Sequence, residues 1–333
     1  MCIPTHNSQS TLPRVIEALT RQEFEDFEVL ICDDASTDST WELLESLKRP
    51  SVKIMRNDAN VNLPGAMKRL FSLATGEFIC MHHDHEYVEP TWLGKMISAL
   101  DTYPSVGMAV PAYDVILSDG RRISRPSILE DRLFRAKNPL PGWDFVRVLV
   151  QRADTPVSAH GTVFRAATVR AVGGYSDRWG LASDEDLYWR VAMAADVAYV
   201  AEPVVVTVVR SSERRSSLGS LGAICTVSAF RREVVRTIFK SRGVARSLHL
   251  ARLSHLEMDA LLREVLSHWM SGSGKTVELI NSLNRIPPLP SGGPVPSCWK
   301  RAVIEGLAGF LSFFPRVGQG LGRARRLLRK DRG

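Results

Sequence analysis

The sequence predicts an α/β protein: a mostly parallel, twisted sheet flanked by helices, followed by a mainly helical C-terminal extension. Three observations favour this fold class. Short apolar runs alternate with helix-like patterns over the first 110 residues, polar residues gather directly after those runs, and strand-like patterns disappear beyond residue 211. With 44% hydrophobic and 24% charged residues in 333, the composition is that of an ordinary globular protein.

The alternation can be followed element by element. Apolar residues at helical spacing predict a first helix at 11–21, with Ser10 as its cap, and further helices at 40–47, 64–74 and 184–194. Short apolar runs predict strands at 27–32, 52–55, 78–81, 106–110, 163–164 and 204–209. Because only Cys2 and Ile3 precede Pro4, we expect the sequence to begin inside its first strand.

The change in pattern near residue 212 predicts two domains. Residues 1–212 would form the α/β domain, made of two halves at 1–110 and 111–212. Residues 213–333 would form the helical extension, with a Pro- and Gly-rich linker at 287–296 and a basic tail at 316–333.

The net charge of +7 is concentrated at the C-terminus. Seven basic residues and one acid lie beyond residue 315, which leaves 36 basic against 35 acidic residues in the rest of the chain. This near-neutral body argues against nucleic acid as a partner. The tail follows an apolar segment at 299–314, so it could contact an anionic membrane surface; a solvated chain end is the alternative.

Location is predicted from what the sequence lacks. No run of about 18 apolar residues and no signal-peptide pattern occurs, and the five cysteines are scattered without a C-x-x-C motif. We therefore expect a cytoplasmic protein, with the tail as a possible link to the inner face of the cytoplasmic membrane.

Polar clusters follow the first two predicted strands. In open α/β sheets, ligands bind at this carboxyl edge. There the ring of His6 could stack on a base, and the carboxylate of Asp34 could accept a hydrogen bond from a uracil-type N–H. The alternative is that these are ordinary strand-end loops, with Thr37 and Asp38 capping the next helix.

A cluster of histidines and acids, His82 to Glu86, follows the strand at 78–81. Asp84 is a hard oxygen ligand for a divalent cation, and His82 or His85 could add a nitrogen, which suits Mn²⁺ better than Mg²⁺. The alternative is a polar surface turn.

Five segments together resemble the inverting family 2 glycosyltransferases with the GT-A fold. They are IPTHN at 3–7, FEVLICDDASTDST at 27–40, ATGEFICMHHDHEYVEPTWL at 74–93, VGGYSD at 172–177 and SDEDLYWRVA at 183–192. The resemblance implies transfer of a sugar from a nucleotide-diphosphate sugar, UDP-type favoured, to a hydroxyl of a lipid-linked, polysaccharide or small-molecule acceptor. It also implies a divalent metal, Mn or Mg, with residues 1–110 binding the donor and 111–212 lying on the acceptor side.

The resemblance assigns donor-side roles to individual residues. The nucleotide-sugar contacts fall on Pro4, Thr5, His6, Asp34, His83 and Asp84. The family's D-x-D region falls on 82–85, which makes Asp84, His85 and His82 the metal candidates; His flanks Asp84 where the family usually has Asp. The family's N-x-G falls on 60–62, and Asn62 at the Gly position tolerates a left-handed backbone.

On the acceptor side, the resemblance places the general base at Asp184, with Glu185 and Asp186 as neighbouring carboxylates. Inverting transfer needs one carboxylate to take the acceptor's proton as its oxygen attacks the anomeric carbon. His160 could line the acceptor side or be a satisfied core histidine. The alternative role of Asp184 is that of a helix N-cap.

Two other functions are considered. A nucleotidyltransferase would need a Gly- and Lys/Arg-rich triphosphate loop after the first strand, and residues 6–10 contain neither Gly nor a basic Lys or Arg. A catalytically degenerate sugar-binding or scaffold relative is the second alternative, because His replaces Asp beside Asp84.

Overall fold

The computed structural model describes residues 1–47, 51–116, 120–125, 137–146 and 161–208, together with Phe230 and Glu233. The chain divides into two units, Met1–Leu218 and Gly219–Gly333, and all elements below belong to the first. The linker at 287–296 and the basic tail at 316–333 lie outside the described residues, so the domain boundary near 212 and the helical extension stay predictions.

The N-terminal part is a parallel three-stranded sheet in the order β1-β2-β3, comprising Cys2–Thr5, Val29–Asp33 and Val52–Arg56. Every residue of β1 and β2 is buried, as expected for strands covered on both faces. In register, Thr5 lies opposite Asp33 and Asp33 opposite Arg56. The strand ends therefore align, and the residues that follow them meet at one edge.

Three helices alternate with these strands: α1 (Leu12–Thr20), α2 (Thr40–Glu45) and α3 (Asn62–Leu73). The prediction that Ser10 caps the first helix is wrong. The N-cap is Thr11, which makes no side-chain capping bond. The carbonyl of Ser8 instead accepts the amide hydrogens of Thr11 (3.0 Å) and Leu12 (2.9 Å), so the backbone itself satisfies the first donors.

The second sheet has the order β4-β8-β6-β9-β5, with β7 paired to β6. Its strands are β4 (Phe78–Cys80), β5 (Glu86–Val88), β6 (Val106–Ile116), β7 (Arg122–Arg125), β8 (Val163–Arg165) and β9 (Asp196–Val208). The mostly parallel sheet predicted from the sequence is correct for β1–β3 and for β6 with β9. The other four pairings are antiparallel. A parallel pair needs a crossover of a dozen or more residues, and β6 and β7 are too close in sequence for one.

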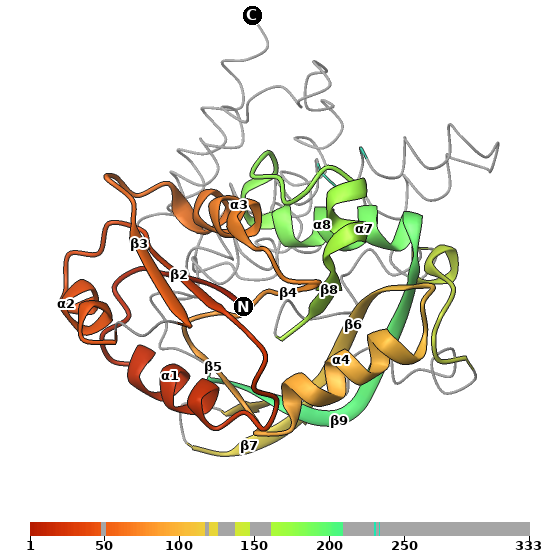
Figure 1. Ribbon diagram of the computed structural model, residues 1–333, viewed down its shortest axis with the longest axis horizontal. Helices are drawn as coiled ribbons and strands as arrows, with labels where there is room; N and C mark the ends of the chain where they lie inside the picture. The colour runs from red at the N-terminus through yellow and green to blue at the C-terminus, as the bar shows by residue number, and fades with distance from the viewer. Residues whose placement is uncertain are drawn as a thin grey trace, which may run out of the picture. The chain divides into compact units, whose positions relative to one another are not determined.

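The two sheets meet where β1 lies beside the end of β4. Cys2 and Met81 form a parallel bridge, and the amide of His82 donates to the carbonyl of Cys2 at 3.1 Å. The loop that carries the His82–Glu86 cluster therefore begins beside the first strand. In Figure 1, α3, α7 (Ala166–Ala171) and α8 (Ser183–Ala194) lie over one face of the strands, while α1 and α4 (Trp92–Thr102) lie over the other.

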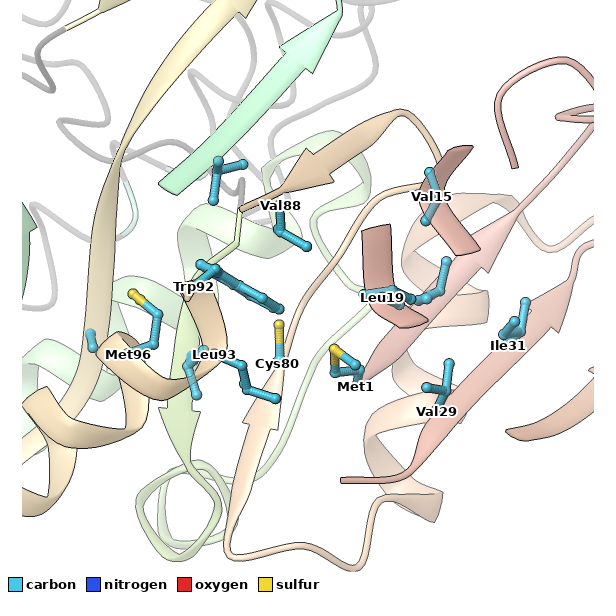
Figure 2. Packing of buried hydrophobic residues seen from close by; sticks show 14 of the residues in the cluster. Met1, Val15, Leu19, Val29, Ile31, Cys80, Val88, Trp92, Leu93 and Met96 are labelled. Atoms are coloured by element: carbon cyan, nitrogen blue, oxygen red, sulfur yellow. The ribbon is translucent and has the colours of Figure 1, made fainter. Parts of the chain in front are cut away.

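The hydrophobic core joins the two sheets. Ile3 and Ile31 from the first sheet share one buried cluster with Cys80, Val88 and Trp92 from the second part of the chain. Figure 2 shows Trp92 and Cys80 beside Met1 and Leu19, between the helices and the strands. Because the apolar packing is continuous, the edge that carries the polar clusters has a rigid base.

Sequence patterns missed several elements that follow β4. The strand β5 and the helix α4 were not predicted, and β6 and β9 extend to 11 and 13 residues where short strands were expected. Register shifts near Pro111 interrupt the β6–β9 pairing, which breaks the regular alternation that pattern reading relies on. Of the helices in the described part, none is long and apolar enough to cross a membrane.

Candidate functional site

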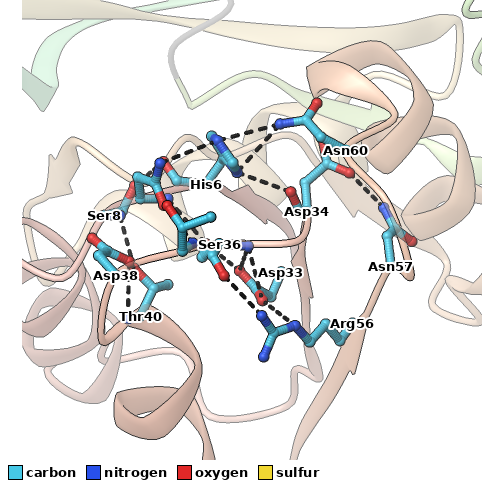
Figure 3. A network of polar contacts seen from close by, with 12 residues as sticks. His6, Ser8, Asp33, Asp34, Ser36, Asp38, Thr40, Arg56, Asn57 and Asn60 are labelled. Atoms are coloured by element: carbon cyan, nitrogen blue, oxygen red, sulfur yellow. Dashed lines mark hydrogen bonds and ion pairs between the residues drawn. The ribbon is translucent and has the colours of Figure 1, made fainter.

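The ends of β1 and β2 are connected by side chains from both loops (Figure 3). The Nδ1 of His6 lies 2.9 Å from the carbonyl oxygen of Asp34, so this nitrogen carries the proton that is donated. The side-chain amide of Asn60 lies 3.3 Å from the same ring. The ring of His6 is thereby fixed above the strand ends, and it remains partly exposed.

Asp34 has one carboxylate oxygen engaged and one available. The residue is 2% exposed, and its Oδ1 accepts hydrogen bonds from the Nδ2 of Asn57 (2.8 Å) and the amide of Val61 (2.9 Å). Its Oδ2 is buried and has no protein partner among the described residues. A buried carboxylate oxygen without a donor is costly, so Oδ2 is suited to a hydrogen-bond donor supplied by a ligand.

A left-handed residue shapes the loop that holds Asp34. Asn62, the first residue of α3, has φ of +63°, as the sequence comparison with N-x-G predicted. The amide of the preceding residue, Val61, donates to Asp34. The expected caps of the second helix, Thr37 and Asp38, are wrong: the N-cap of α2 is Ser39, which makes no side-chain capping bond. Asp38, one residue earlier, accepts the Thr40 amide at 3.1 Å, and Thr37 donates to Asn7.

Asp84 is tied to the first strand. It is 5% exposed, and its Oδ2 accepts hydrogen bonds from the hydroxyls of Thr5 (3.3 Å) and Ser8. Its Oδ1 lies 3.1 Å from the Nδ1 of His85. The Ser8 hydroxyl oxygen also lies 3.1 Å from the carbonyl oxygen of His6, so the loop after β1 carries the base-stacking candidate and also contacts Asp84. Pro4, in β1, is buried opposite Cys32.

His82 does not join the other histidines of its cluster. Its side chain is fully buried, with its ring centroid 5.8 Å from that of Trp92. Burial lowers the pKa of His82, so the ring is neutral, and its Nδ1 donates to the carbonyl of His83 at 2.8 Å. His82 therefore packs beneath the loop, where sequence reasoning had counted it among the metal candidates.

Three residues of the loop after β4 and the start of β5 form a group of possible metal ligands. His83, His85 and Glu86 offer ligand atoms that all lie within 4.8 Å of one another. Burial lowers the pKa of His85, which keeps its imidazole in the neutral form that binds metals, and Glu86 is completely buried. This set of two imidazoles and a carboxylate, beside Asp84, fits a divalent transition-metal ion.

Glu86 is the member of this group that sequence reasoning missed. It is the first residue of β5, and its Oε2 accepts the amide of His83 at 3.2 Å. The sequence does show an acidic residue directly after His85, but the strand β5 was not predicted. Without that strand, the sequence did not indicate that the Glu86 side chain contacts His83.

Asp184 lies in the first turn of α8. The N-cap of this helix is Ala182, which leaves Asp184 inside the helix and not at the cap. The hydroxyl of Tyr175 donates to its Oδ1 at 2.5 Å. Asp186, 9% exposed, pairs with Arg190 at 2.7 Å, and Glu185 is also buried, at 8% exposed.

Tyr188, in α8, is buried beside charged groups. Burial and, next, the charge of Asp184 raise the pKa of the Tyr188 phenol, and the charge of Glu86 raises it further. The phenol therefore stays protonated. His160, the other acceptor-side candidate, lies outside the described residues.

This arrangement can be compared with known proteins. Residues 1–156 match the family model described as Glycosyl transferase family 2. Residues 1–156 therefore belong to glycosyltransferase family 2. EpsE of Bacillus subtilis is 28% identical to this chain over 194 residues, which cover 56% of the chain and 63% of EpsE.

Further relatives bear names that specify a sugar or a polymer. The Escherichia coli UDP-Glc:alpha-D-GlcNAc-diphosphoundecaprenol beta-1,3-glucosyltransferase WfaP is 26% identical over 100 residues, covering 30% of this chain and 40% of WfaP. The Rhizobium meliloti succinoglycan biosynthesis protein ExoO is 31% identical over 121 residues, covering 36% of this chain and 34% of ExoO. The chain thus spans less than two thirds of the length of these relatives.

Solved structures show the same fold. The structure of Staphylococcus aureus TarS 1–349 in complex with UDP-GlcNAc superposes with a TM-score of 0.59 and 16% identity, covering 85% of this chain and 79% of that one. The structure without that ligand gives a TM-score of 0.56. The α/β fold expected from the sequence is therefore confirmed as one that resembles TarS.

Proposed function

We propose that this protein transfers a sugar from a UDP-sugar to a hydroxyl group of an acceptor, with inversion at the anomeric carbon. The observations that support the proposal are the buried Oδ2 of Asp34, which has no partner in the described part of the chain, and the hydrogen bond that ties Asp84, on the loop after β4, to Thr5 of β1. The names of WfaP and TarS, which specify a glucosyl- and an N-acetylglucosaminyltransferase, support a hexose-type sugar.

The nucleotide would bind at the ends of β1 and β2. The N3–H of uracil would donate to the Oδ2 of Asp34, and the fixed ring of His6 would stack on the base. Pro4 and Thr5 would form the floor beneath the nucleotide. His83 and Asp84, on the loop after β4, would face the diphosphate and the sugar.

Asp84, His85, His83 and Glu86 would hold a divalent metal ion. Such an ion, when bound, neutralises the charge of the departing diphosphate. Imidazole ligands favour Mn²⁺ over Mg²⁺, which prefers an all-oxygen environment. For His82 we propose support of this loop from below, because its proton is already donated to the His83 carbonyl.

Asp184 would act as the general base. The acceptor's hydroxyl oxygen forms a bond to the anomeric carbon as the bond from that carbon to the UDP phosphate oxygen breaks. The hydroxyl proton passes to the carboxylate of Asp184, and UDP leaves with the electron pair. Glu185 and Asp186, on the same helix, would line the acceptor side together with His160.

The acceptor would be a growing polysaccharide or a lipid-linked sugar, as the names of ExoO and WfaP suggest, or a small molecule. A role in cell-envelope polysaccharide biosynthesis would follow. A cytoplasmic location and contact of the 316–333 tail with anionic lipid remain predictions from the sequence.

The substitution Asp184→Asn tests the proposed base. We expect UDP release from UDP-GlcNAc or UDP-glucose, measured with a panel of sugar acceptors, to fall at least about a hundredfold, since a positioned base contributes about 10²–10⁴. UDP binding, measured by calorimetry, should be nearly unchanged. Asp177→Asn is the matched control, because Asp177 is an exposed acid paired with Lys68. Full turnover by Asp184→Asn would remove Asp184 from the mechanism.

Direct titration of the metal tests the ligand group. The change Glu86→Gln should weaken Mn²⁺ binding at least about tenfold, as measured by calorimetry or electron paramagnetic resonance, while Mg²⁺ should bind more weakly than Mn²⁺ to the unaltered protein. Glu89→Gln is the control, because Glu89 lies three residues away and pairs with Arg122 at the surface. Equal Mn²⁺ affinity in Glu86→Gln and the unaltered protein would contradict the assignment.

A further inference from the structure

We propose that Tyr175 is a positioning residue for Asp184: its hydroxyl holds one carboxylate oxygen, so that the other oxygen is left to take the acceptor's proton. The inference deepens the proposed function and rests on it, because it gives the assigned base a fixed orientation. It starts from the hydrogen bond of 2.5 Å between the Tyr175 hydroxyl and the Oδ1 of Asp184.

The surroundings of Tyr175 fix its ring. The residue is 5% exposed, and its ring centroid lies 5.2 Å from that of Phe71 in α3. Phe71 in turn contacts the ring of Phe164 at 6.2 Å. With this packing the phenol has little freedom to turn away, so its hydroxyl can serve as a fixed donor.

The backbone that carries Tyr175 is anchored to the helix of Asp184. Gly173 and Gly174 both have positive φ, +90° and +74°, which directs the chain into the turn before Tyr175. The Nη1 of Arg190, in α8, donates to the carbonyls of Val172 and Gly174, both at 2.7 Å. Arg190 also pairs with Asp186 on its own helix. The turn and the first part of α8 are therefore held together at a second point, beyond the Tyr175 hydroxyl.

The direction of the hydrogen bond follows from the charges. Burial, and after it the negative charge of Asp184, hold the pKa of Tyr175 well above its usual range, so the phenol stays protonated and donates. The other ionisable groups that act on Tyr175 are Tyr188 and Asp186 from α8. Glu86 from β5 and Cys80 from β4 act on Tyr188.

The hydrogen bond has a chemical consequence for the base. The phenol fixes the direction of the carboxylate group, so that its second oxygen is presented in one orientation. Since Oδ1 is occupied by the phenol, the transferred proton would go to Oδ2. Tyr175 contacts neither donor nor acceptor in this scheme; it acts through Asp184.

The substitution Tyr175→Phe removes the hydroxyl and keeps the ring that packs on Phe71. We expect kcat for UDP release to fall roughly tenfold, because a carboxylate that can turn presents Oδ2 to the acceptor hydroxyl less often. The KM for the UDP-sugar and the thermal midpoint of unfolding should change little. Tyr188→Phe is the matched control: it removes an equally buried hydroxyl from the same helix as Asp184, one that interacts with Thr162, and should leave kcat nearly unchanged.

The outcomes separate this inference from the proposed function. If Asp184→Asn is inactive and Tyr175→Phe keeps the unaltered kcat, the positioning role is refuted while the base stands. If Asp184→Asn retains turnover, the base itself fails and the inference fails with it. A change confined to KM in Tyr175→Phe would also refute positioning, because it would indicate a role in donor binding.

Discussion

Exchange of Asp34 for Asn tests the base-recognition site with an almost isosteric change. In the unaltered protein, Oδ1 of Asp34 accepts two hydrogen bonds, from Asn57 and from the Val61 amide, and Oδ2 accepts none from the described protein. Because both protein donors need an acceptor, the carbonyl oxygen of the new amide would take the place of Oδ1. The NH₂ group would then occupy the position of Oδ2, facing the base.

The size of the effect can be worked out from this geometry. Uracil N3–H and the new NH₂ group would both be donors, so UDP would lose a hydrogen bond to a charged group, worth about 1.5–3 kcal/mol. At about 1.4 kcal/mol per factor of ten, the dissociation constant for UDP should rise roughly 10- to 150-fold. Cytosine has an acceptor at N3, so CDP should bind Asp34→Asn better than it binds the unaltered protein.

Titration calorimetry with UDP and CDP on both proteins measures the two effects together. Asp58→Asn is a useful control, because Asp58 is an exposed acid on the same connection between β3 and α3. Unchanged UDP affinity in Asp34→Asn would refute the assignment of Oδ2 to the base. Equal losses for UDP and CDP would refute it as well, since they would indicate a general disturbance of the loop.

Two further predictions concern stability. The ion pair with Lys53 (2.8 Å), together with hydrogen bonds from Thr75, lowers the pKa of Glu28 from 4.5 to about 2. Because the pKa is lowered in the folded protein, the ionised Glu28 stabilises the fold fully above pH 4.5, and this contribution is lost as the pH falls toward 2. Because Lys53 is well exposed, we expect Glu28→Gln to lower the free energy of unfolding by only about 1 kcal/mol at pH 7. Near pH 2 the free energies of unfolding of the two proteins should be equal. A difference that persists there would contradict the ion pair as its cause. Asn62 has φ of +63°, so we expect Asn62→Ala to lower the free energy of unfolding by about 1–2 kcal/mol in a denaturant titration and Asn62→Gly to lower it much less. Equal effects of the two substitutions would show that the left-handed backbone is not the reason.

Sequence reasoning reached furthest where strand, turn and helix follow one another closely. The strand before Asp33, the helix beginning near Asn62 and the strand ending near Cys80 were all predicted to within a few residues. In that region short buried strands and amphipathic helices each give a clear local pattern. The left-handed Asn62 could likewise be predicted, because a single backbone conformation restricts the residue type there.

The remaining features depend on contacts between distant residues. His82 could not be separated from His85 by sequence, since only the packing against Trp92 buries one ring and leaves the other beside Asp84. Glu86 joins His83 because β5 pairs with β9, more than 100 residues later. The bond from Tyr175 to Asp184 requires the turn that Arg190 holds, which no local pattern reports.

The supports of Asp34 and Asp84 come from different parts of the chain. Asn57 and Val61, on the connection between β3 and α3, hold the first carboxylate, whereas Thr5 and Ser8 hold the second. Changes at sites without shared partners usually add. An engineer could therefore vary nucleobase preference through the β3–α3 connection and cation choice through the β4–β5 loop, provided that His6 and Ser8, which contact Asp34 and Asp84 from the loop after β1, are kept unchanged.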